Sequence, residues 1–243
     1  MADVRYPSQT QAQAAIDQGL RSYMLRVYNY MTGGLVITAL TAVGTFNAIY
    51  DSAASDRLSP LGHTVMPMMW VLMLAQIGIV FFLAFRVQKM SVAGAQLAFW
   101  SYAVLTGVTF ASLGFHYTGA SIGRVFLITA GTFGAMSLYG YTTRRDLTGM
   151  GSFLMMGLIG LIIASIVNIF FASGTMSWVL SVIGVGIFTG LTAYDTQKIK
   201  EMYFGGDDVA VMGRKAIMGA LSLYLDFINL FLQLLRLMGS SRN

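Results

Sequence analysis

The sequence predicts an all-α membrane protein that crosses the bilayer seven times. Of its 243 residues, 56% are hydrophobic and only 10% are charged, whereas soluble domains carry about 25% charged residues. Seven apolar runs, each long enough to cross roughly 30 Å of hydrocarbon, follow one another along the chain. Because 15 basic and 10 acidic side chains cannot cover the surface of a soluble globule of this size, an ordinary soluble domain is excluded.

The chain begins with a polar segment, residues 1–26, which lacks the short apolar core of a signal peptide. We expect this segment to be cytoplasmic and the rest, residues 27–243, to form a single seven-helix transmembrane domain. Polar residues 201–212 form the one longer loop between spans. The spans are expected at about residues 27–50, 66–87, 92–115, 121–143, 150–172, 176–197 and 213–238. The short gap before the sixth span predicts a tight hairpin.

Basic residues in the loops predict the orientation, since Lys and Arg are enriched on the cytoplasmic side of membrane proteins. We therefore interpret the net charge of +5 as a sign of how the chain is oriented in the membrane, and not as a surface for binding nucleic acid. With the N-terminus inside, Trp70 and Trp178 fall at the outer ends of their spans, as expected of interfacial aromatics. Eleven basic residues then face the cytoplasm and four face outward: Arg5, Arg21, Arg26, Arg86, Lys89, Arg144, Arg145, Lys198, Lys200, Arg214 and Lys215 against Arg57, Arg124, Arg236 and Arg242.

What the sequence lacks excludes several kinds of chemistry. There is no Cys, so disulfides, thiolate metal sites and Cys nucleophiles are excluded. His63 and His116 fall in outer loops without metal-ligand spacing. No zinc-protease, serine-hydrolase, Walker A or dinucleotide-binding motif occurs. We therefore expect neither an enzyme nor a bound cofactor.

Two aspartates in the last two spans carry the strongest functional signal. An ionisable residue within a bilayer costs about 2.5–3.5 kcal/mol on insertion scales and is a functional hypothesis by default. Asp226 lies about halfway along the seventh span, and Asp195 lies near the end of the sixth with Lys198 three residues later. Because these spans are consecutive and antiparallel, the two carboxylates could meet. They would then share a proton and titrate as a coupled pair.

Depth in the membrane argues against this meeting. Along straight helices, Asp195 lies nearer the cytoplasmic boundary than Asp226 by about 10 Å, at about 1.5 Å per residue. The pair therefore requires a sixth helix that runs past the membrane or a tilted seventh helix. In the alternative interpretation, Asp195 is a membrane-edge carboxylate paired with Lys198, and Asp226 hydrogen-bonds to another helix for packing.

Arg86, at the cytoplasmic end of the second span, is a third candidate. A guanidinium there can bridge to a carboxylate on another helix. The alternative is an ordinary residue whose charged end extends to the membrane surface.

The motifs around the two aspartates resemble a known family. Residues 192–199, TAYDTQKI, and 220–236, ALSLYLDFINLFLQLLR, closely resemble the Bax inhibitor-1 family in its bacterial branch, and TRRDL at 143–147 does so more weakly. The resemblance implies six helices around a central seventh and a pH-sensitive calcium leak, with Asp195 and Asp226 as the proton-sensing pair. It also implies a basic latch on the second helix, for which Arg86 and Lys89 are both candidates.

The leading functional hypothesis is therefore a calcium leak channel in a bacterial inner membrane. The Asp195 and Asp226 carboxylates would bind Ca²⁺ weakly and in competition with H⁺, because Ca²⁺ prefers more oxygen ligands than two carboxylates supply. Protonation would release the latch and let the second helix swing. The expected partners are the lipid bilayer, Ca²⁺, H⁺ and, in the alternative below, another membrane protein.

Two hypotheses from other classes stay open. A non-enzymatic regulator would bind a membrane protein, such as a quality-control protease, through the polar N-terminal segment and small-residue helix faces. An intramembrane aspartyl protease would use two carboxylates that share a proton to activate water. Against the protease, the sequence before Asp226 reads Tyr-Leu and not Gly-x-Gly, and no Pro-Ala-Leu follows.

Overall fold

A computed structural model describes residues 9–51 and 58–242 of the chain, with side chains from residue 16 onward. Within these ranges seven long helices are apolar enough to cross a membrane, which confirms the predicted number. The short elements η1 (Val87–Lys89) and α4 (Leu113–His116) lie beside α2 and α3, respectively. The long helices are α1 (Gln9–Ile49), α2 (Pro60–Arg86), α3 (Val92–Phe110), α5 (Gly119–Thr142), α6 (Thr148–Phe171), α7 (Gly174–Glu201) and α8 (Val209–Met238).

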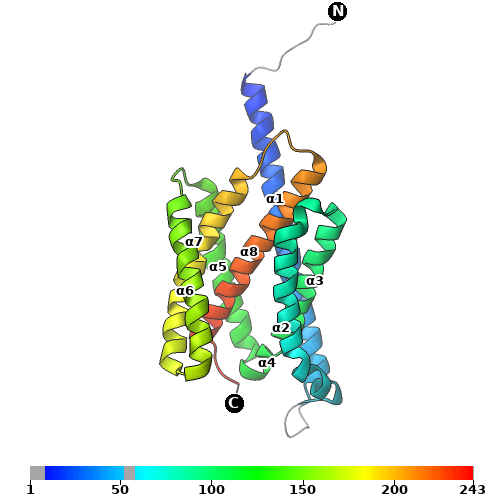
Figure 1. The fold of residues 1–243 in the computed structure, drawn as a ribbon, viewed down its shortest axis with the longest axis vertical. Helices are drawn as coiled ribbons and strands as arrows, with labels where there is room; N and C mark the ends of the chain where they lie inside the picture. The colour runs from blue at the N-terminus through cyan, green and yellow to red at the C-terminus, as the bar shows by residue number, and fades with distance from the viewer. Residues whose placement is uncertain (1–8, 52–57, 243) are drawn as a thin grey trace, which may run out of the picture.

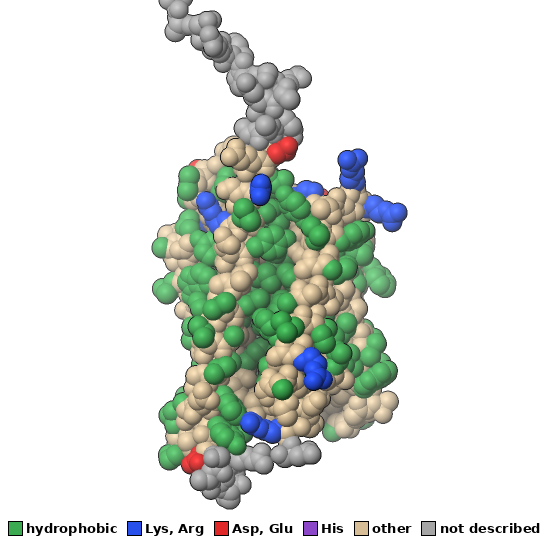
Figure 2. All heavy atoms as spheres, turned by 180° about the vertical axis from the view of Figure 1, so that it is seen from behind, with side chains coloured by type: hydrophobic (Ala, Val, Ile, Leu, Met, Phe, Trp, Pro, Cys, Tyr) green, Lys and Arg blue, Asp and Glu red, His purple; other side chains and the backbone are tan. Residues whose placement is uncertain are grey.

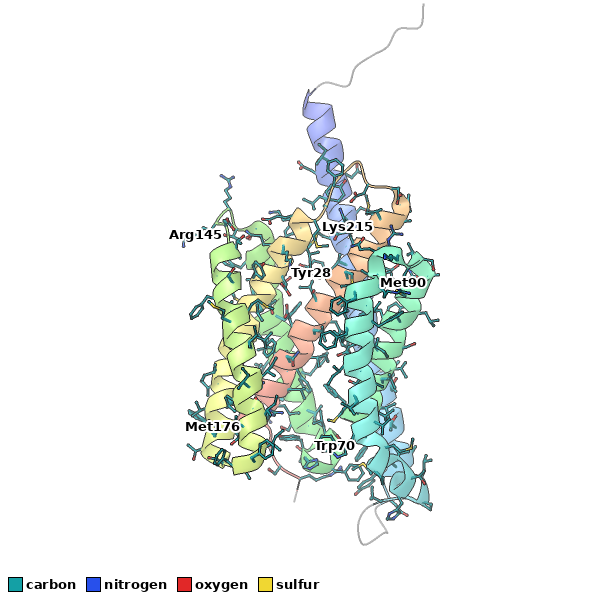
Figure 3. All side chains as sticks on the ribbon, in the orientation of Figure 1. Tyr28, Trp70, Met90, Arg145, Met176 and Lys215 are labelled. Carbon is teal, nitrogen blue, oxygen red and sulfur yellow. The ribbon has the colours of Figure 1, made fainter. Side chains whose placement is uncertain are left out.

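The helices form an elongated bundle in which α1 begins at one end and α8 finishes at the other (Figure 1). We call these the N end and the C end of the bundle. Side chains at the N end include Arg145 and Lys215, and Trp70 and Met176 lie toward the C end (Figure 3). The predicted association of Trp70 with the end opposite the N-terminus is thus confirmed.

Several helices extend further than the apolar runs predicted: α2 begins at Pro60 and α8 at Val209, six and four residues before their expected starts. Helix α1 begins at Gln9 and not at residue 27, and α7 continues to Glu201, four residues beyond the expected end. Hydropathy marks only the part of a helix that faces hydrocarbon, whereas the backbone hydrogen bonds continue wherever the residues allow a helix. The polar segment before residue 27 is therefore helical over the residues described here.

Polar side chains define where most of the helices begin. Ser91 and Ser173 accept hydrogen bonds from the backbone N–H three residues later, at 3.1 and 3.2 Å, and Asp208 does the same for Val211 at 2.7 Å. Such N-caps satisfy backbone donors that have no partner within the helix. The predicted hairpin between α6 and α7 is confirmed, because Ala172 adopts the left-handed conformation (φ 47°) and reverses the chain directly before Ser173.

Helix α8 is the central element, as the family resemblance implies. It packs against α1, α3, α5 and α7, and 67% of its most apolar 18-residue window is buried, against 6% for α6. In Figure 1 it crosses the bundle at a slant, with α6 and α7 on one side and α2 on the other. A residue on α8 can therefore face other helices from almost any direction.

The surface of the bundle matches a lipid environment. Exposed apolar side chains cover the helices, among them Phe170 (83% exposed) and Trp70 (75%). Figure 2 shows hydrophobic side chains along the middle of one face and Lys or Arg mainly toward its two ends. Arg5 and Arg57, which enter the predicted charge count, lie outside the described residues.

A short C-terminal segment, residues 239–242, closes the C end of the bundle; we call it the C-terminal strap. The backbone N–H of Thr118 donates to Ser240 O at 3.2 Å, and that of Arg242 donates to His116 O at 2.8 Å. The Ser240 N–H also donates to Ser121 Oγ at 2.8 Å. The strap thereby ties the end of α8 to the start of α5.

Candidate functional site

The structure brings Asp195 and Asp226 together. Both residues line the same cavity beside α7 and α8, where each carboxyl group acts electrostatically on the other. Asp226 is only 5% exposed, whereas Asp195 is partly buried. One of the two arrangements that the depth of these residues requires is present, since α8 crosses the bundle at a slant (Figure 1).

The direction of the Asp226 side chain follows from what holds α8 in place. Two residues earlier, the Tyr224 hydroxyl forms a 2.6 Å hydrogen bond with Thr38 Oγ1 of α1, which in turn donates to Ala103 O of α3 at 2.9 Å. Residues two apart on a helix point about 200° away from each other. Tyr224 therefore faces α1 and α3, and Asp226 faces α7 on the opposite side.

The residues that follow Asp195 in the TAYDTQKI motif attach α7 to the neighbouring helices. Thr196 Oγ1 lies 3.0 Å from Ser137 Oγ of α5, and the Tyr28 hydroxyl of α1 lies 2.6 Å from the same serine oxygen. The Gln197 amide accepts a hydrogen bond from Leu147 N–H and donates one to Arg145 O, each at 2.8 Å. Asp195 is thus held on a segment fixed from three directions.

Gln197 is a positioning residue that the sequence reasoning missed. Its side chain is 6% exposed, and both polar ends bind the loop between α5 and α6. The available signal was its place two residues after Asp195 in the motif. Nothing in the sequence indicated that the loop around Leu147 would be its partner, because that loop is 50 residues away along the chain.

A cavity of about 520 Å³ extends from the aspartate pair along α8. Its α6 wall is mostly apolar, whereas its α8 wall carries polar residues at intervals of three or four. Such spacing places them on one face of the helix. These residues are Ser222, Asp226, Asn229, Gln233 and Arg236.

Two oxygens in this cavity are buried without a hydrogen-bond partner among the described residues, Asp226 Oδ2 and Gln233 Oε1. Leaving a buried polar atom without a partner costs about 1–3 kcal/mol, so native proteins rarely do so without a reason. Arg236, at the C-end limit of the cavity, is exposed. The cavity thus offers a row of oxygen atoms to a small cation, a proton or water.

Arg86 and Lys89, the two latch candidates, both have exposed side chains. In the described part of the chain, no ion pair joins either of them to Asp195 or Asp226. The charge that acts on Asp195 is that of Lys198, three residues later on α7. The role of Arg86 or Lys89 as a latch therefore stays a prediction.

The described residues contain no group of three or more His, Cys, Asp or Glu side chains that could hold a metal ion. Ca²⁺ usually takes six to eight oxygen ligands in a stable site. The Asp195 and Asp226 carboxylates supply few of these ligands.

Comparison with known proteins gives consistent matches along the chain. The sequence profile of a family described as "Inhibitor of apoptosis-promoting Bax1" matches residues 20–243. An uncharacterized protein of Rickettsia prowazekii, RP147, is 47% identical over 96% of both chains. Inner membrane protein YbhL of Escherichia coli is 46% identical over 92% of this chain and 94% of its own. An uncharacterized protein of Caulobacter vibrioides is 42% identical over 95% and 93%, respectively.

Proposed function

This chain belongs to the Bax inhibitor-1 family, and from that membership and the aspartate pair we propose that it is a pH-sensitive calcium leak channel. Protonation of Asp195 and Asp226 gates it. The observation that carries the proposal is that two carboxyl groups, each acting electrostatically on the other, line one polar cavity in a membrane-spanning bundle. The name of the related YbhL supports a place in a bacterial inner membrane, and the basic N end supports a cytoplasmic N-terminus.

The gating step follows from electrostatics. Two carboxylates in a buried site repel each other unless a proton or a cation lies between them. Loss of the proton leaves a negative site that attracts Ca²⁺, a hard ion that prefers oxygen ligands. Gain of a proton removes the charge that Arg86 or Lys89 would bind as a latch, so α2 is released. We therefore expect calcium flux to rise as the pH falls.

The route from the pair toward the C end runs along the polar face of α8. Asn229 and Gln233 continue the row of oxygens in the same cavity. Backbone and side-chain oxygens that replace the hydration shell are the usual lining of an ion path through a membrane. The path ends at Arg236, whose positive charge opposes rapid passage of cations. This arrangement favours a slow leak over a highly conducting pore.

The test is calcium entry into liposomes that hold the full-length protein and an internal calcium dye. Influx is recorded against external pH for wild type, Asp195→Asn and Asp226→Asn. We expect both variants to lose the pH response, because each removes one member of the proton-sharing pair. An unchanged pH profile in Asp195→Asn would refute the proposed gate.

Asp146→Asn is the matched control for these variants. Asp146 is an exposed carboxylate in the loop between α5 and α6, and hydrogen bonds from the side chain and backbone N–H of Thr148 lower its pKa. It therefore stays ionised near neutral pH and does not titrate with the gate. Its replacement should leave the pH dependence of the influx as in wild type.

The regulator hypothesis is the second candidate function. The first turns of α1 project beyond the rest of the bundle at the N end (Figure 1), where they can bind another membrane protein without disturbing the helices. Deletion of residues 1–15 should abolish such binding and leave calcium influx intact. Neither candidate function involves catalysis, so we keep the expectation that the protein is not an enzyme.

A further inference from the structure

A second cavity lies near the C end of the bundle, on the side of α8 that faces α1 and α5. Its volume is about 360 Å³, which falls within the range of ligand-binding cavities, about 300–1,000 Å³. Its floor is formed by Phe227, Ile228 and Phe231 of α8, all less than 9% exposed. It shares no lining residue with the cavity that holds the aspartate pair.

The mouth of this cavity opens toward lipid between α1 and α5. Ala39 and Val43 of α1 and Gly119 and Gly123 of α5 line the cavity and are exposed at its edge. A Cβ atom added at Gly123 would meet nothing within 4 Å. Both helices lie behind α8 in the view of Figure 1, so their face is turned to the viewer in Figure 2, where hydrophobic side chains run down its middle. A hydrocarbon chain can therefore enter sideways from the bilayer.

One charged side chain, Arg242 of the C-terminal strap, lies at the end of this apolar cavity. Its guanidinium lies over the rings of Phe46 and Tyr50, at 5.3 and 5.2 Å from their centroids, and donates to Gly114 O at 2.5 Å. A guanidinium has five N–H donors and pairs well with a phosphate group. Because the strap holds its backbone to His116, Arg242 is presented in a fixed position.

From this combination we propose that the cavity binds an anionic phospholipid of the surrounding bilayer, with one acyl chain between α1 and α5 and its phosphate group on Arg242. An empty apolar cavity loses the packing contacts that a hydrocarbon chain restores, and water does not fill such a space. Basic residues between transmembrane helices attract anionic head groups. This lipid site is independent of the proposed calcium leak.

The test is lipid binding by the full-length protein in detergent, measured by native mass spectrometry. The probes are dioleoyl phosphatidylglycerol, which is anionic, and dioleoyl phosphatidylethanolamine, which has the same chains and no net charge. We expect wild type to bind phosphatidylglycerol roughly fivefold more tightly than phosphatidylethanolamine. This ratio corresponds to the attraction of about 1 kcal/mol between one basic residue and an anionic membrane surface. Arg242→Gln should remove this preference, and Arg236→Gln, at the same end of the bundle, should keep it.

The acyl-chain part of the site is tested by filling the mouth. Gly123→Phe should lower the binding of both lipids, because the new ring occupies the entrance. Gly131→Phe is the control, since Gly131 is also an exposed glycine of α5 with nothing within 4 Å and does not line the cavity. A preserved fold in Gly123→Phe is checked by comparing its thermal unfolding with that of Gly131→Phe.

Three outcomes would overturn the proposal. The first is binding of phosphatidylglycerol by Gly123→Phe as tight as that of wild type. The second is a preference for this lipid that survives Arg242→Gln. The third is a mass spectrum that shows a dimer of the chain without bound lipid, because a second copy of the chain would then occupy the cavity. In a supporting experiment, phosphatidylglycerol with a photoreactive acyl chain should label the Phe231 peptide in wild type and not in Gly123→Phe.

Discussion

The two sides of α8 differ in how their polar groups are satisfied. On the side toward α1 and α3, the Tyr224 hydroxyl and Thr38 Oγ1 are fully buried and bonded to each other at 2.6 Å. On the side toward α6 and α7, Asp226 Oδ2 and Gln233 Oε1 are buried with no partner among the described residues. One helix thus carries a closed hydrogen-bonded face and an open polar face.

The difference assigns stability to one side of α8 and the proposed transport function to the other. A satisfied buried network fixes the rotation and position of α8, whereas an unsatisfied one leaves polar atoms available for an ion, a proton or water. Substitutions on the α1–α3 side should therefore lower stability. Substitutions on the α6–α7 side should change transport more than they change stability.

A loss of stability larger than that of Tyr224→Phe is expected from Gly107→Ala, where α3 packs closely on α1. A Cβ atom at this position would lie 2.6 Å from Thr38 O and 3.1 Å from Ala42 N, both backbone atoms that cannot turn away. Overpacking of this kind costs roughly 1–3 kcal/mol, and we expect the free energy of unfolding to fall by an amount at the upper end of this range. Unfolding in mixed micelles of a mild detergent and dodecyl sulfate measures it.

Gly78→Ala, on the exposed side of α2, is the control for Gly107→Ala because its Cβ would meet nothing within 4 Å. Alanine is the better helix former by about 1 kcal/mol, so this variant should equal or exceed wild type in stability. If Gly107→Ala were as stable as Gly78→Ala, close packing on the α1–α3 side of α8 would not contribute to stability.

A smaller loss is expected from Tyr224→Phe. The variant removes the 2.6 Å hydrogen bond to Thr38, but Thr38 Oγ1 keeps its bond to Ala103 O. A single buried hydrogen bond contributes about 1 kcal/mol, and the same unfolding experiment should show that decrease. Tyr139→Phe, at a tyrosine that is 42% exposed, should show none.

The smallest effect on stability is expected from Gly184→Ala, on the open side. The new Cβ would lie 2.8–3.0 Å from atoms of the Gln233 side chain, which can move into the cavity. Stability should change little, because the better helix propensity of alanine, about 1 kcal/mol, offsets the cost of moving the Gln233 side chain. Calcium influx into liposomes should fall, because the displaced side chain narrows the cavity along the polar face of α8. Gly186→Ala, whose Cβ would meet nothing within 4 Å, should keep wild-type influx. Equal influx in the two variants would contradict the route along Gln233.

Much of the fold follows from the sequence because hydrocarbon imposes a simple rule. A helix that crosses the bilayer needs about 20 apolar residues, and the seven runs found by that rule are the seven long helices. The extension of α1 back to Gln9 was missed, since residues outside the hydrocarbon may be polar and still helical. The inclination of α8 also could not be predicted, because packing against four other helices determines it.

The site was predicted only in part. Asp195 and Asp226 could be selected because a carboxylate in a span is rare and costly. The partners that position them could not, since Thr38 and Tyr224 are 186 residues apart and Gln197 and Leu147 are 50 apart. Polar residues such as Gln233 and Thr38 resemble ordinary contacts between helices until the direction of each side chain is known.

The central claim is that Asp195 and Asp226 share a proton. Infrared difference spectroscopy of the protein in lipid, between acid and alkaline pH, detects the carbonyl band of a protonated carboxyl group directly. We predict a band that disappears from its wild-type position in both Asp195→Asn and Asp226→Asn and persists in Asp146→Asn. A band that stays at the wild-type position and pH in either of the two pair variants would show that the carboxyl groups titrate independently, and would contradict the claim.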